Sequence, residues 1–140
     1  MENQILTRQR HNGSGLGNGS NGKDVALNKD GTIVYAAGAA PYLFTKISVD
    51  TMSVEATLAA DAYPAGIETG PNDELHGVID NTNGPQDIWI YESNNSLRTV
   101  DYLSNHGTRI IDRALAVSGD GYVSIAITSD PRVVFFSSYP

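Results

Sequence analysis

The chain of 140 residues contains no cysteine, so disulfide bonds and thiolate chemistry are excluded. Charged residues make up only 18% of it, and nine lysines and arginines face 16 aspartates and glutamates. The net charge of -7 argues against a nucleic-acid partner, because neutralising phosphates requires clustered basic side chains. No apolar run approaches the roughly 18 residues of a membrane span, and the first residues lack the basic and apolar regions of a signal peptide. We therefore expect a soluble protein with no membrane partner.

Glycine, asparagine and short runs of β-branched residues are abundant instead, a profile typical of an all-β protein with many turns. Three segments begin alike, each as a short apolar strand that runs into a turn of Asn, Asp and Gly, at residues 24–31, 65–73 and 113–121. Asp30-Gly31 and Asp120-Gly121 provide the tolerance of positive φ that a tight hairpin needs. These segments mark three repeats.

Each repeat continues in the same order, with a second strand, a proline-containing loop and a third strand. The second strands are expected at residues 32–37, 75–80 and 122–128, and the third strands at 43–49, 87–92 and 132–137. A fourth strand follows only in the first two repeats, at 54–58 and 97–102. Residues 5–9 form the one further strand that the sequence predicts, and they precede the first repeat.

Residues 25–37, Val-Ala-Leu-Asn-Lys-Asp-Gly-Thr-Ile-Val-Tyr-Ala-Ala, resemble the opening of a YVTN-type β-propeller repeat, and residues 115–123 are similar to it. The second repeat departs from this pattern, with Gly70-Pro71-Asn72-Asp73 in place of the Asp-Gly turn, and the Trp-Asp dipeptide of WD repeats is absent. The resemblance implies four-stranded blades of about 40 to 50 residues. It implies little about function, because this fold carries binding modules, scaffolds and enzymes.

Two architectures agree with these repeats, a β-sandwich and a β-propeller. The strand count favours the propeller, because one strand at the start, two sets of four and three at the end fit blades closed by both termini. We predict an all-β fold with three four-stranded blades, at residues 24–64, 65–112 and 113–140. In this prediction the strand at 5–9 completes the third blade through a glycine-rich connection, residues 11–23, which lacks the Gly-Lys-Ser/Thr of a phosphate loop.

The number of blades predicts the assembly. Propellers typically contain about four to eight blades, and three blades would leave two apolar faces exposed. We therefore expect a homodimer in which two half-rings form one six-bladed propeller. The N-terminal strand would then be exchanged between the two chains.

Loops that join one blade to the next, and second strands to third strands, would gather at one end of such a propeller. These loops contain ionisable side chains that we select as candidates for ligand binding: His11, Asp61, Tyr63, His106, Arg109 and Asp112. An alternative is that these loops are simply solvated surface. Metal-ligand spacing is absent from the sequence, and we predict no cofactor. Trp89 alternates as a strand residue does and is expected in the core.

Two functions remain open. The first is a non-catalytic binding or structural module that presents the loops beside the central channel to a protein, a glycan or a larger assembly, such as a virion or surface component. The second is an enzyme similar to the propeller lactonases and lyases, with a metal or an acid–base site at the mouth of the channel.

Overall fold

The computed structural model describes residues 22–39, 41–80, 88–101, 110–129 and 133–137, and all regular structure in these segments is β-strand. The all-β prediction is therefore confirmed. No helix long and apolar enough to cross a membrane occurs among the described residues. The predicted strand at 5–9 and most of the glycine-rich connection, up to residue 21, lie outside these segments.

The strands form three antiparallel sheets, each built in chain order. Sheet 1 contains β1 (Gly22–Leu27), β2 (Ile33–Ala39), β3 (Tyr42–Ser48) and β4 (Ser53–Ala59). Sheet 2 contains β5 (Pro64–Thr69), β6 (Leu75–Ile79), β7 (Ile88–Tyr91) and β8 (Leu97–Asp101). Sheet 3 contains β9 (Ile110–Val117), β10 (Val123–Thr128) and β11 (Val133–Ser137).

The turn between the first two strands of each sheet explains why the second repeat departs from the others. Gly31 and Gly121 adopt φ of 70° and 77°, as the Asp-Gly pairs predict. In sheet 2 the equivalent position is Asp73, with φ 63°. Aspartate tolerates this left-handed conformation better than most residues do. Asp73 therefore closes the same kind of turn without a glycine.

Two expected loop ends belong to strands. Asp112, selected as a residue of a loop between blades, lies in β9, which begins at Ile110. Gly22 and Lys23, expected in the connection at 11–23, lie in β1. The pairing of β9 with β10 is irregular between the Leu115 and Ile110 pairs, and Arg113 within it has φ 63°. This interruption bends the strand without ending it, which alternation of residue types alone does not reveal.

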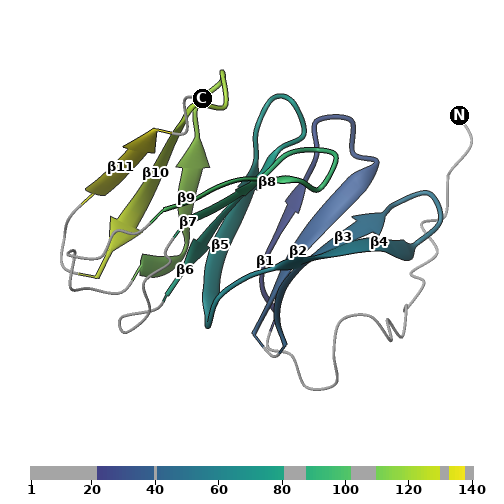
Figure 1. Ribbon diagram of the computed structural model, residues 1–140, viewed down its shortest axis with the longest axis horizontal. Coiled ribbons are helices and arrows are strands. Elements are labelled where there is room, and N and C mark those ends of the chain that lie inside the picture. The colour runs from purple at the N-terminus through teal and green to yellow at the C-terminus, as the bar shows by residue number, and fades with distance from the viewer. Residues whose placement is uncertain (1–21, 40, 81–87, 102–109, 130–132, 138–140) are drawn as a thin grey trace, which may run out of the picture.

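The three sheets lie in a row, with sheet 2 in the middle (Figure 1). One core cluster joins sheet 1 to sheet 2, and it includes Tyr35, Phe44, Leu75 and Trp89. A second cluster joins sheet 2 to sheet 3 through Ile88, Ile90, Ile110 and others. Sheet 2 is covered on both faces, so every residue of β6 and β7 is buried. The prediction that Trp89 is a core residue is confirmed.

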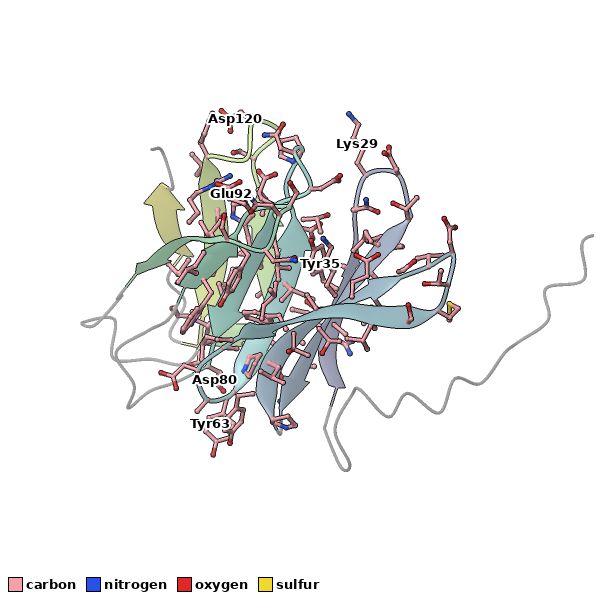
Figure 2. The ribbon with its side chains drawn as sticks, turned by 45° about the vertical axis from the view of Figure 1, so that its right-hand side comes forward. Lys29, Tyr35, Tyr63, Asp80, Glu92 and Asp120 are labelled. Carbon is pink, nitrogen blue, oxygen red and sulfur yellow. The ribbon has the colours of Figure 1, made fainter. Side chains whose placement is uncertain are left out.

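Two further features position the candidate residues. The first strands of the sheets, β1, β5 and β9, contact one another. The hairpin turns that carry Lys29 and Asp120 lie at one end of the molecule, and Tyr63 and Asp80 lie at the opposite end (Figure 2). We call the end with Tyr63 and Asp80 the loop end.

Candidate functional site

Asp61 and Tyr63 lie at the loop end, in the connection from β4 to β5. The Asp61 carboxylate accepts a hydrogen bond of 2.7 Å from the Ala62 N–H and so holds the local turn. Tyr63 has φ 65°, is 53% exposed, and its carbonyl accepts a hydrogen bond of 2.7 Å from the Asp80 N–H. Its ring lies 5.4 Å from that of Tyr42, and hydrogen bonding to Tyr63 raises the pKa of Tyr42. The two tyrosines form an aromatic surface that a ligand can reach.

Asp112 belongs to a charged junction where β1, β5 and β9 meet. Lys23 Nζ lies 3.1 Å from Asp112 Oδ2, and Arg113 Nε donates to the Lys23 carbonyl oxygen over 2.9 Å. Asp24 of β1 links the junction to β5, because its carboxylate accepts a hydrogen bond of 3.1 Å from the Ile67 N–H. The Arg113 guanidinium lies 3.9 Å from the same carboxylate. Each charge thus has a partner on another sheet, and these contacts connect β1 to both β5 and β9.

A pocket of about 480 Å³ opens beside this junction. Its lining comes mainly from sheet 1: Gly22, Lys23, Asp24, Val25, Ala36, Ala37, Gly38, Pro41, Leu43 and Thr45, with Arg113 from sheet 3. Most of these residues are apolar or small, and the charged ones belong to the junction. The pocket is large enough for a small ligand or for several side chains of another protein surface.

A buried polar cluster joins sheet 2 to sheet 3. His76 Nδ1 lies 2.8 Å from Ser124 Oγ, and His76 Nε2 lies 3.7 Å from Glu74 Oε1. The other carboxylate oxygen of Glu74 accepts a hydrogen bond of 2.8 Å from the Asn72 N–H. A Cβ at Gly70 or at Gly121 would collide with Glu74 Oε1, so both glycines leave room for the carboxylate.

The cluster has the residue types of an acid–histidine–serine site, but none of them can meet a substrate. Glu74, His76 and Ser124 are at most 1% exposed. Burial lowers the pKa of His76 to about 4, against the opposing attraction of Glu74. The imidazole is therefore neutral at pH 7, and we interpret the cluster as a structural contact between two sheets.

Sequence reasoning did not select these residues. A signal was present, because Glu74 occupies the position that Ile33 and Val123 hold in the other sheets: its carbonyl oxygen and theirs accept the equivalent hydrogen bond across the turn. A carboxylate at a strand position that is otherwise β-branched and apolar marks a local departure from the repeat.

The structure describes three of the six predicted candidates. Asp61 and Tyr63 lie together at the loop end, and Asp112 lies in the charged junction. His11, His106 and Arg109 lie outside the described residues. Within the described segments, no three His, Asp or Glu side chains are grouped so that they could hold a metal ion.

No protein-family model and no curated protein matches the chain. Its fold resembles that of solved structures, among them hydrazine synthase of Kuenenia stuttgartiensis, with a TM-score of 0.69 at 17% sequence identity. The match covers 83% of this chain and 34% of that chain, so this chain spans about a third of its length. At this identity the similarity concerns the fold alone.

Proposed function

We propose that the chain is a non-catalytic binding or structural module, built as three blades of a β-propeller, that presents its loop end to a protein or glycan. The Tyr42–Tyr63 ring contact, in which Tyr63 is 53% exposed and Tyr42 is partly buried, is the observation that carries the binding part of this proposal. Aromatic rings with one apolar face and a polar tip are common in contacts with proteins. Tyr63 lies at the opposite end of the molecule from the short hairpin turns that carry Lys29 and Asp120 (Figure 2).

The blade architecture is part of the proposal. It is supported by three sheets of the same strand order that lie in a row, with their first strands in contact. The residues 5–9 remain the proposed fourth strand of sheet 3, supplied by the second chain of a homodimer. Two such half-rings would give a ring of six blades, within the range of about four to eight that propellers contain.

An enzyme of the lactonase or lyase type is the alternative. The acid–histidine–serine cluster does not favour it, because a reacting group must touch its substrate and these side chains are buried. A catalytic site would then have to be sought at the loop end, where Asp61 is engaged in holding its own turn.

A glycan array and a metal analysis of the purified protein separate the two functions. We expect binding that Tyr63→Ala weakens at least tenfold while Lys29→Ala, at the opposite end of the molecule, leaves it unchanged. Exposed positions such as these usually change stability by about 0.5 kcal/mol or less, so the fold stays intact. Stoichiometric, tightly bound metal, or binding lost only in the Lys29 variant, would contradict the proposal.

A further inference from the structure

The row of sheets ends in two apolar faces that sheet 2 does not cover. We call them the outer face of sheet 1 and the outer face of sheet 3. On the first, Val25, Leu27 and Val54 are 69%, 58% and 42% exposed. On the second, Ile127 is 44% exposed and Ile125 is partly buried. Large aliphatic side chains exposed together on a sheet face indicate a surface that another surface covers.

Each exposed position has an equivalent that is buried inside the molecule. The hydrogen bonds across the turns and the strand registers align Val25 with Ile67, which is 3% exposed, and Val34 with Leu75, which is fully buried. They align Ile127 with Val78, which is fully buried. The outer faces therefore have the composition and register of faces that are covered by a neighbouring sheet.

The two internal interfaces use the same pair of positions. Tyr35 of sheet 1 and Leu75 of sheet 2 share one core cluster, and the Tyr35 hydroxyl reaches the carbonyl oxygen of Asp73. One sheet further along the row, His76 contacts Ser124 over 2.8 Å. Tyr35 and His76 are equivalent positions, as are Leu75 and Ser124.

The next members of these two series are both partly buried and lie on faces that no sheet of the described segments covers. Ile125 is the equivalent of Tyr35 and His76, and Val34 is the equivalent of Leu75 and Ser124. They lie on opposite outer faces of the same chain. One chain thus carries both halves of a third interface of the same kind, and it cannot join them itself, because sheet 2 separates them.

We propose that the outer face of sheet 3 packs on the outer face of sheet 1 of a second copy of this chain, with Ile125 of one copy against Val34 of the other. The partner's sheet then covers Val25, Ala36 and Thr45, which pair across sheet 1 on that outer face and line part of the pocket. Two copies that face each other make this contact twice, so both outer faces of both copies are buried. The inference rests on the homodimer of the proposed function and specifies its interface.

The alternative within a dimer is symmetric contact, with sheet 3 against sheet 3 or sheet 1 against sheet 1. Neither internal interface has this form, because each joins two different faces. Head-to-tail contact reproduces the internal register, and contact between like faces does not.

Charge complementation tests the pairing. Ile125→Glu and Val34→Lys should each lose the dimer, because each places an unpaired charge in both apolar contacts. Mixing the two variants should restore it, since the mixed dimer has one Glu–Lys contact and one unchanged contact. Sedimentation velocity measures the mass, and circular dichroism of each variant verifies its fold. The matched control is a mixture of Ile125→Glu with Ile125→Lys, which should remain monomeric.

Three results would overturn the inference. These are a dimer that persists in both single variants, a restored dimer in the control mixture but not in the test mixture, and a folded monomer of the unchanged chain. None of them bears on glycan binding at the loop end, so failure of the interface and failure of the binding function are distinguishable. If a single variant fails to fold, Val25→Lys and Ile127→Glu replace the pair, since they lie on the same two faces.

Discussion

The buried imidazole of His76 makes the stability of the protein depend on pH. Its pKa is 6.5 in an exposed state and about 4 in the folded protein. Burial is the main cause, and the attraction of Glu74 at 3.7 Å does not offset it. Because the unfolded chain binds a proton more readily than the folded protein between these values, stability is lost as the pH falls from 6.5 to 4.

The size of this loss follows from the two pKa values. Each pKa unit corresponds to about 1.36 kcal/mol, so the full difference is about 3 kcal/mol at pH 4 and below. His76 is fully buried, so solvent screening does not reduce this contribution appreciably. The loss is large against the roughly 5–15 kcal/mol of a typical domain.

Urea unfolding from pH 8 to pH 4 measures the effect, with His76→Gln as the comparison. Glutamine can keep a hydrogen bond to Ser124 and does not titrate. The variant keeps every other ionisable residue of the sequence, so the comparison of the two proteins isolates the imidazole. The stability of the unchanged protein minus that of the variant should fall by about 3 kcal/mol between pH 6.5 and pH 4. A difference that stays constant over this range refutes the reasoning.

Three further predictions concern packing and charge. Gly77→Ala places a methyl group against the ring of Phe44 and should cost about 1–3 kcal/mol in urea unfolding, whereas Gly119→Ala, which meets no atom within 4 Å, should change little. Ile88→Ala removes a fully buried side chain between sheets 2 and 3 and should cost about 2–5 kcal/mol, so an effect below 1 kcal/mol would contradict the assigned core. Lys23→Ala breaks a partly exposed ion pair with Asp112, and such pairs usually contribute about 1 kcal/mol or less to stability. The melting temperature should therefore fall by no more than a loss of this size produces. A larger fall would show that the other charges of the junction depend on Lys23.

Local signals in the sequence predicted the described strands, apart from the starts of β1 at Gly22 and of β9 at Ile110, which lie in segments expected to be loops. Asp30-Gly31 and Asp120-Gly121 mark turns, and alternation marks the strands beside them. The contacts between sheets were not predicted, because they join residues far apart in the chain. His76 meets Ser124 across 48 positions, and Arg113 reaches the Lys23 carbonyl across 90. No local sequence pattern predicts such contacts.

The candidate site was less predictable than the fold. Asp61 and Tyr63 were selected as loop residues; both lie in the connection from β4 to β5, and Tyr63 lies at one end of the molecule (Figure 2). Asp112 was expected in a loop but belongs to β9, and its carboxylate lies 3.1 Å from Lys23 Nζ of β1. Arg113 beside it has φ 63°, a conformation that is uncommon for residues other than glycine and that residue types do not predict.

Sedimentation equilibrium of the unchanged chain, from low to high micromolar concentration, tests the assembly most directly. We predict one species of twice the 15.0 kDa chain mass that does not grow with concentration, because two head-to-tail contacts close on themselves. A folded species of 15.0 kDa throughout, or a mass that rises steadily with concentration as in an open polymer, would contradict it.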